Sequence, residues 1–80
     1  MKLKKLIKLL NPNEAIVIHV LNKVGDWEKN KFCGKVKNVP YSLLNYYIIN
    51  SIEDMGYAIN FIMSEWGSAA IEILCYEPII

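Results

Sequence analysis

The sequence contains no arginine, no glutamine and no threonine, and it has a single histidine. Planar, bidentate recognition of phosphate, guanine or carboxylate is mostly performed by arginine, so its absence argues against sites of that kind. With His19 alone, a multi-histidine metal site or a histidine-paired nucleophile within one chain is nearly excluded. No glycine-rich phosphate loop occurs either. We therefore predict that the protein is not an enzyme and that it holds no metal and no cofactor.

The chain is also poor in cysteine, with only Cys33 and Cys75. They lie in apolar, strand-like segments and belong to no CxxC motif or Cys/His cluster. The N-terminal segment is too interrupted by lysine for a signal peptide, and no apolar run approaches the ~18 residues of a membrane span. These features predict a cytoplasmic protein with two buried thiols, and a disulfide between them stays an open alternative.

Hydrophobic residues, by contrast, are abundant and make up 54% of the 80 residues. Soluble domains usually contain about 45–50%. A chain of this length forms one domain, residues 1–80, whose high surface-to-volume ratio makes so much apolar material difficult to bury. Because exposed apolar patches usually become interfaces, the composition predicts a homo-oligomer or a tightly bound partner.

Charge is distributed unevenly along the chain. Residues 1–38 contain all nine lysines and three acidic residues, a net charge of +6, whereas residues 39–80 contain five acidic residues and no basic one. The basic half is compatible with a nucleic-acid-binding module whose lysines contact phosphates. The overall charge of +1 and the missing arginine weigh against this alternative. The excess of Ile, Asn, Lys and Tyr is typical of AT-rich coding, as in a low-GC bacterium or its phage.

The first ten residues predict a short amphipathic helix that ends at Asn11-Pro12. Its apolar residues follow the i, i+3, i+4, i+7 spacing of one helix face, with lysines elsewhere: Leu3, Leu6, Ile7 and Leu10. Such a short helix is unstable alone in water, so it must dock on something. Two interpretations are open: a helix that lies on a sheet with solvated lysines, or a basic helix for an anionic membrane or nucleic-acid surface.

The middle of the chain predicts a β-hairpin. Residues 15–21 form a β-branched strand that is apolar on both faces and therefore central or covered on both sides. A polar loop follows over residues 22–30, and a second strand over residues 32–36, with Gly34 marking a bulge or a close backbone approach. Residues 39–45 suit a single helical turn with Pro40 at or near its first position.

Residues 46–76 predict an antiparallel meander. Two breaks divide this stretch into strands over residues 46–53, 57–64 and 69–76. Part of it, residues 52–66, also fits a helical stripe, in which Gly56 would cost about 1 kcal/mol relative to alanine. The strand assignment is favoured because residues 65–68 join two segments of matching length. The fold class predicted is α+β, a short N-terminal amphipathic helix packed on a small, mostly antiparallel sheet of about five strands.

Several short motifs occur in a recognisable order: the lysine-rich residues 2–10, Asn11-Pro12, Gly34-Lys35-Val36 and residues 39–44. This layout resembles small, uncharacterised accessory proteins found in phages and mobile elements of low-GC bacteria. The resemblance covers most of the chain and brings no catalytic or binding residue with it. It implies an accessory protein in a bacterial host cell that interferes with host defence by binding something.

Candidate binding residues are mainly aromatic side chains in predicted loops, because tryptophan and tyrosine commonly anchor interfaces or stack on ligand rings. His19 is included as a ligand-contacting or pH-sensitive strand residue, although a half-buried histidine on a sheet face is the alternative. The predicted binding residues are Trp27, Trp66, Tyr41, Tyr47, His19, Lys23 and Lys29. They favour a non-enzymatic homo-oligomer that blocks or sequesters a host protein or small ligand, with nucleic-acid binding as the alternative.

Overall fold

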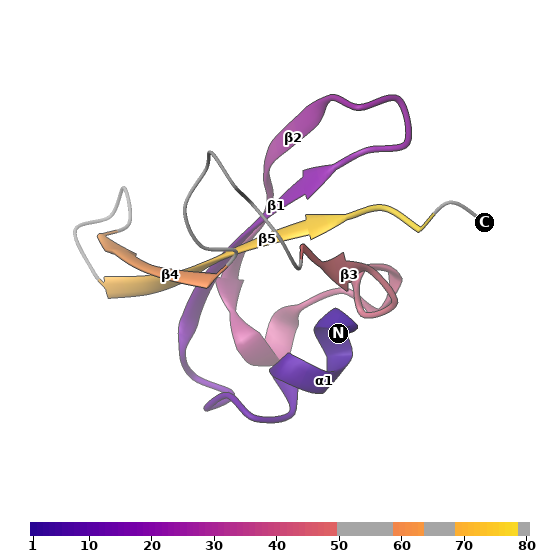
Figure 1. Ribbon diagram of the computed structural model, residues 1–80. Coiled ribbons are helices and arrows are strands. Elements are labelled where there is room, and N and C mark those ends of the chain that lie inside the picture. The colour runs from indigo at the N-terminus through magenta and orange to yellow at the C-terminus, as the bar shows by residue number, and fades with distance from the viewer. Residues whose placement is uncertain (50–58, 64–68, 79–80) are drawn as a thin grey trace.

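The computed structural model describes residues 1–49, 59–63 and 69–78 (Figure 1). These residues form a small α+β fold with little helix and one mixed sheet. The elements in chain order are helix α1 (Leu3–Ile7), strands β1 (Ala15–Leu21) and β2 (Trp27–Lys35), the 3₁₀ turns η1 (Val36–Asn38) and η2 (Tyr41–Leu43), and strands β3 (Tyr47–Ile48), β4 (Ile59–Met63) and β5 (Ala69–Tyr76). Among them, no helix has the length and apolar character needed to cross a membrane.

The sheet is mixed, and the prediction of a mostly antiparallel sheet is corrected on this point. Its strand order is β2-β1-β5-β3, and β4 also pairs with β5. β1 is antiparallel to β2 but parallel to β5, with Ile18 opposite Ile73. A parallel pair needs a long crossover connection, and here the whole of β2, β3 and β4 lies between the two partners in sequence. The closing strands therefore could not be placed by local turn signals.

The predicted meander over residues 46–76 is confirmed for its last antiparallel pair, β4 with β5, and is wrong for its first. β3 and β4 are not neighbours; both are antiparallel to β5 and divide the same edge of it between them (Figure 1). β3 pairs with Cys75 and Tyr76 at one end, and β4 pairs with residues 69–73. The strand interpretation is confirmed for residues 59–63. The remainder of the ambiguous segment, residues 52–58 and 64–66, lies outside the described residues.

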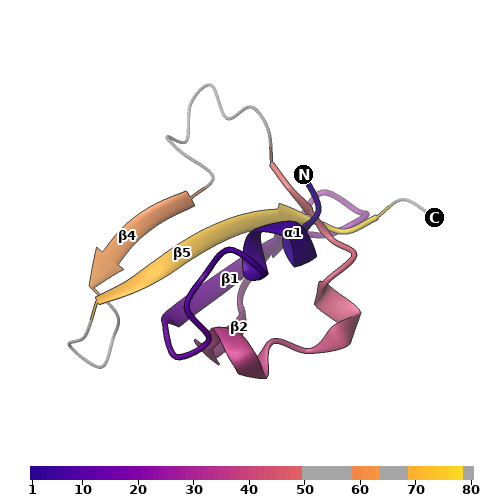
Figure 2. The same ribbon diagram turned by 90° about the horizontal axis from the view of Figure 1, so that it is seen from below.

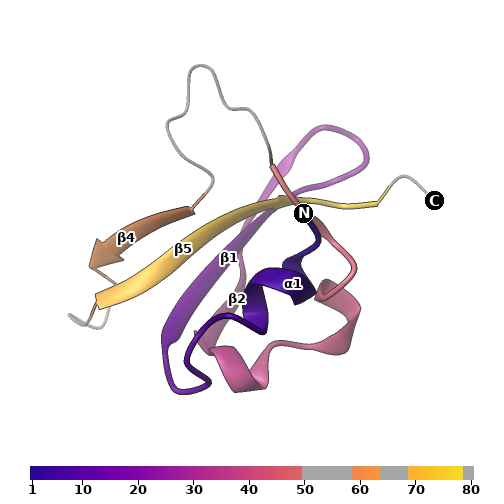
Figure 3. The ribbon, with the colours of Figure 1, turned by 60° about the horizontal axis from the view of Figure 1, so that its bottom comes forward.

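The hydrophobic core lies on one face of β1 and β5, which we call the helix-covered face. Alternation along the two strands places six residues there, each at most 4% exposed: Ile16, Ile18, Val20, Ile71, Ile73 and Cys75. α1 and the segment of η1 and η2 pack over this face (Figures 2 and 3). Full burial of one large aliphatic side chain contributes about 1.5–3 kcal/mol, so this face supplies most of the stability.

The N-terminal helix is shorter than predicted but docks as the first interpretation proposed. Leu3 is fully buried, and Leu6 and Ile7 pack against the core, while the lysines at positions 4, 5 and 8 are exposed. The chain before and at the start of α1 is held by backbone hydrogen bonds: the Leu3 N–H donates to Tyr46 O and the Ile48 N–H to Met1 O, both at 2.8 Å. The N-terminus thus also covers the outer edge of β3, where Lys2 and Tyr47 form a bridge.

The hairpin of β1 and β2 agrees with the prediction in β1 and departs from it in β2. β1 has the predicted bounds and is central, because its β-branched side chains need neighbours on both faces. β2 begins at Trp27, within the predicted polar loop, so the actual turn spans Asn22 to Asp26, with Gly25 at φ +91°. A Cβ atom at Gly34 would lie 3.1 Å from the Phe32 ring, so the neighbour at this glycine is a side chain and not the closely approaching backbone of the prediction.

Two smaller predictions are settled by the fold. Pro40 precedes the η2 turn, which confirms the single helical turn in this segment. Cys33 and Cys75 are not joined in a disulfide. Cys33 lies opposite Val17 and therefore faces away from the core, whereas Cys75 is fully buried within it on the other side of the sheet. Only Cys75 fits the prediction of a fully buried thiol.

Candidate functional site

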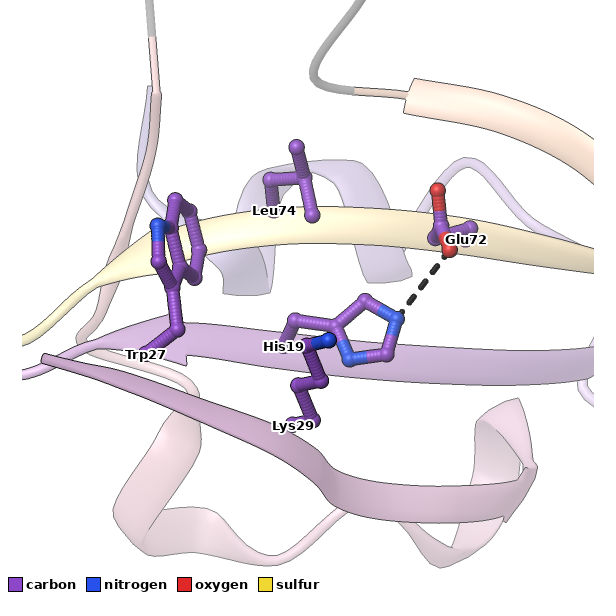
Figure 4. Close-up of a pocket in the computed structure, with 5 residues that line it drawn as sticks. All are labelled: His19, Trp27, Lys29, Glu72 and Leu74. Carbon is purple, nitrogen blue, oxygen red and sulfur yellow. Dashed lines mark hydrogen bonds and ion pairs between the residues drawn. The ribbon is translucent and has the colours of Figure 1, made fainter. Parts of the chain in front are cut away.

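A pocket of about 420 Å³ opens on the side of the sheet away from α1, which we call the pocket face. Its lining comes from three adjacent strands: His19 from β1, Trp27 and Lys29 from β2, and Glu72 and Leu74 from β5 (Figure 4). Strand alternation explains this grouping, because these positions are out of phase with the core residues on the same strands. The volume lies within the range of about 300–1,000 Å³ typical of small-molecule sites.

His19 and Glu72 form the polar centre of the pocket. The Asn30 backbone N–H donates to His19 Nδ1 at 2.9 Å. Since Nδ1 accepts, the neutral ring carries its proton on Nε2, which donates to Glu72 Oε2 at 3.1 Å. The two side chains are 15% and 26% exposed, so the hydrogen bond is shielded from most of the solvent. Both ring nitrogens are thus occupied, and the imidazole is fixed in one orientation and one tautomer.

A bulge in β2 makes this arrangement possible. Ile18 pairs with Phe32 and Val20 with Glu28, so His19 faces three residues of β2 where a regular ladder would supply one. Asn30 sits inside the bulge with φ +54°, in the left-handed region that asparagine tolerates better than most residues. The bulge turns the Asn30 N–H toward the His19 ring and lets β2 place Lys29 at the pocket.

The lysines of the bulge differ in their partners. Lys31 Nζ lies 2.8 Å from Glu28 Oε1, and this hydrogen bond lowers the pKa of the Glu28 carboxyl and raises that of Lys31. Lys29 is exposed and, within the described ranges, its side chain makes no hydrogen bond or ion pair. It also forms no ion pair with Glu72, although both line the pocket. The site therefore presents two separate charges of opposite sign.

The apolar part of the pocket comes from Trp27 and Leu74. Leu74 is 8% exposed and lies opposite His19 in the parallel register, so it forms the floor. Figure 4 shows the Trp27 ring standing at one end of the pocket, with its indole nitrogen on the side away from His19, and Glu72 at the other end. Further along the same face, Tyr47 and Tyr76 stack with ring centroids 5.4 Å apart. The Trp27 ring is the aromatic wall of the pocket, and such a wall suits stacking on a flat ligand.

The structure brings three of the predicted binding residues into one site: His19, Trp27 and Lys29. Tyr47 stacks on Tyr76, and the Lys2 ammonium lies 5.7 Å from the centroid of the Tyr47 ring. Tyr47 therefore contributes to the packing of β3 against β5. Lys23 lies in the β1–β2 turn, where its backbone N–H donates to Glu77 Oε2. Neither residue lines the pocket.

Of the two remaining aromatic candidates, the structure describes one. Tyr41 is 89% exposed and borders a separate depression of about 310 Å³ beside α1, lined by Ile7, Pro12, Val36, Lys37, Val39, Tyr41 and Leu44. Trp66 lies outside the described residues. Tyr41 is therefore a natural control position for experiments on the pocket.

Glu72 and Leu74 were not among the predicted site residues. The alternation of the last strand does place both on one face, together with Tyr76. The alternation cannot predict which strand lies beside the last one. Glu72 contacts His19, 53 residues away in sequence, only because β1 and β5 pair in parallel. A charged residue in an otherwise apolar strand was the one available signal.

The chemistry of the site is that of recognition by hydrogen bonds, charge and stacking. In the part of the chain that the structure describes, no three His, Cys, Asp or Glu side chains gather as metal ligands do. Comparisons with protein-family models, curated proteins and solved structures found no match to this chain. The function must therefore be argued from the geometry of the pocket.

Proposed function

We propose that this protein is a non-enzymatic binding protein that sequesters a small ligand in the pocket of His19, Trp27, Lys29, Glu72 and Leu74. One observation carries the proposal: Lys29 and Glu72 line the same open pocket beside an aromatic wall and do not pair with each other. Charged groups left without each other in a concave site are available to a bound molecule. Burial of Trp27 against a ligand would add stacking and apolar contact.

The state of His19 supports binding over catalysis. A general base needs an accessible lone pair within hydrogen-bond reach of the proton that it removes. The Nδ1 lone pair accepts from the Asn30 N–H, and the Nε2 proton is directed at Glu72. His19 therefore acts as a positioning residue that fixes the Glu72 carboxylate. No second histidine of the chain could take the role of a general base, since His19 is the single one.

We further propose that the protein acts as a homo-oligomer through the edge formed by β4. This strand contains no charged residue, and its Ile59 and Met63 are 41% and 70% exposed. The opposite edge, β2, carries exposed lysines and a bulge, which are features that discourage pairing between sheet edges. Two copies joined by β4 across a two-fold axis would bring no charged residues of the two β4 strands together.

The biological setting of such a protein comes from the sequence. Its motif order resembles accessory proteins of phages and mobile elements, and sequestering a host molecule is a direct way for such a protein to interfere with defence. The proposal is thus an anti-defence accessory protein that acts by stoichiometric capture of a ligand.

Native mass spectrometry of the protein purified from cells without denaturants tests the proposal. We expect an oligomer that carries additional mass, lost in Trp27→Ala and retained in the matched control Tyr41→Ala. Both substitutions remove an aromatic ring, but only Trp27 lines the pocket. Equal retention in the two variants would contradict the pocket as the ligand site. A monomer in the wild-type protein would contradict the oligomer.

A further inference from the structure

The groups that a ligand can reach in the pocket define what the ligand must offer. Glu72 Oε2 already accepts from His19, whereas Oε1 has no hydrogen-bond partner among the described residues and is the oxygen left for a bound molecule. The Lys29 ammonium is a donor with no partner among the described residues. A bound molecule therefore has to present a donor to Glu72 and an acceptor to Lys29.

The charges of the pocket further restrict the chemical class of the ligand. The pocket holds one positive and one negative side chain, together with a histidine that is neutral in the tautomer fixed by its neighbours. A strongly anionic ligand would meet the Glu72 carboxylate, and a cationic one would meet Lys29, so each would be opposed by one group. An ammonium group carries three donors and is costly to remove from water, whereas the pocket offers a single open carboxylate oxygen. A neutral group with one donor and one acceptor matches the site in number and in charge.

Trp27 and Leu74 decide the shape of the ligand. The indole ring forms a wall at one end of the pocket, and Leu74 provides an apolar floor beside His19 (Figure 4). Stacking of a flat ring on an aromatic side chain contributes about 1–3 kcal/mol in nucleobase-binding proteins. A planar ring is thus favoured over a flexible aliphatic molecule, which would lose more conformational freedom on binding.

From these three constraints we infer that the pocket binds a planar heterocycle through a lactam edge, an N–H next to a C=O, as in uracil and hypoxanthine. In this arrangement the ring lies against Trp27, its N–H donates to Glu72 Oε1, and its carbonyl oxygen accepts from Lys29 Nζ. The inference rests on the proposed function, because it names the ligand class of the same site. The ring can belong to a free nucleoside or to a nucleotide in a single strand.

Isothermal titration calorimetry with the full chain tests the inference. The probes are inosine and uridine, each paired with a control in which the lactam N–H is methylated, 1-methylinosine and 3-methyluridine. We expect both parent nucleosides to bind and the methylated forms to bind at least ~10-fold more weakly, because each methyl group removes the donor to Glu72. Equal binding of the parent and methylated forms would overturn the inference.

Matched substitutions locate the contact. Lys29→Met should weaken inosine binding at least ~5-fold, while Lys23→Met, which removes a lysine outside the pocket, should leave it unchanged. Far-ultraviolet circular dichroism verifies that both variants are folded. If the two variants lose the same affinity, Lys29 is not the donor to the ligand and the inference is wrong.

A short oligouridine strand and the amino acid leucine complete the design. An oligouridine that binds more tightly than uridine, and loses affinity when its bases are N3-methylated, supports the inference and identifies single-stranded nucleic acid as the source of the ring. Binding that weakens with salt but is unchanged by N3-methylation reflects phosphate contacts and overturns the inference. Binding of leucine alone, abolished by Trp27→Ala, overturns the lactam class but leaves the proposed function standing. Failure of every probe, with no retained cellular ligand in the mass spectrum, overturns both.

Discussion

The two faces of β1 and β5 are made from alternate residues of the same segments, yet they differ in almost every property. On the helix-covered face, all six core residues are at most 4% exposed and apolar. On the pocket face, the positions between them include His19 and Glu72, which share a hydrogen bond, beside the buried Val17 and Leu74. One face specifies stability, and the other tolerates polar groups because their partners are supplied by a neighbouring strand. Substitutions on each face can test this division.

The largest effect is expected in the core. Ile18 is fully buried, and Ile18→Ala should lower the free energy of unfolding by about 2–5 kcal/mol because it leaves a cavity. Ile18→Val, at about 0.5–1.5 kcal/mol, keeps the fold measurable if the alanine variant is unfolded. Urea denaturation followed by circular dichroism gives both values. Leu21 lies on the pocket face and is half-buried, so Leu21→Ala should lower the free energy of unfolding by less than Ile18→Ala. An equal loss would remove the distinction between the faces.

A second test uses the buried thiol of the core. Burial raises the pKa of Cys75 from its ordinary value of 9.0 to about 12. Below pH 9 the thiol is protonated in both the folded and the unfolded chain and contributes no pH dependence. Above it, only the unfolded chain releases the proton, so the stability falls by ~1.4 kcal/mol per pH unit until the folded pKa is reached. Cys75→Ala should lose this slope; an unchanged slope between pH 9 and about 11 would show that other groups cause it.

On the pocket face, the corresponding substitution is His19→Ala. It removes the acceptor of the Asn30 N–H and the donor to Glu72, and each polar group left without a partner costs about 1–3 kcal/mol. Partial exposure of the site lets water replace these bonds, so we expect a loss near the lower end of that range. Thermal unfolding monitored by circular dichroism measures it. The double variant His19→Ala/Glu72→Ala should recover part of the loss; additive effects would contradict the coupling.

The bulge that supports His19 predicts a smaller effect. Asn30 has φ +54°, so Asn30→Ala should destabilise the protein by about 1 kcal/mol, while Asn30→Gly should be nearly neutral. Neither substitution removes the backbone N–H that donates to His19, which makes the pair a measure of backbone conformation alone. Chemical denaturation of the two variants provides the comparison. If alanine and glycine are equivalent, the left-handed conformation is not maintained in solution.

The smallest effect on stability is expected for Lys29, which we assign to ligand binding. Lys29→Met removes an exposed charge that has no described partner, so the free energy of unfolding should change by less than about 0.5 kcal/mol. A differential scanning calorimetry trace that coincides with the wild-type trace would agree. A clear loss of stability would place Lys29 within the structural framework and weaken its assignment to a ligand.

The success of the sequence-based prediction follows the same division between local and distant interactions. The bounds of β1 were predicted correctly because its β-branched run determines strand structure by itself. β2 was predicted too short, since four of its first five residues, Glu28 to Lys31, are polar or charged, as suits an edge strand with one free side. The η2 turn followed from Pro40, whose fixed φ starts a helical turn. Each of these features depends on residues close together in the chain.

The sequence alone determined which residues of each strand share a face, because side chains alternate whatever the strand pairs with. It also determined that one face of β1 would be wholly apolar and that His19 would lie on the other. Only the tertiary structure decided that β1 and β5 run parallel, with Glu72 two residues from the Leu74 partner of His19, and that the bulge of β2 brings Lys29 to them. Pairing and register between distant strands are set by the packing of the whole core and not by local preference, so the pocket exists only once the chain has folded.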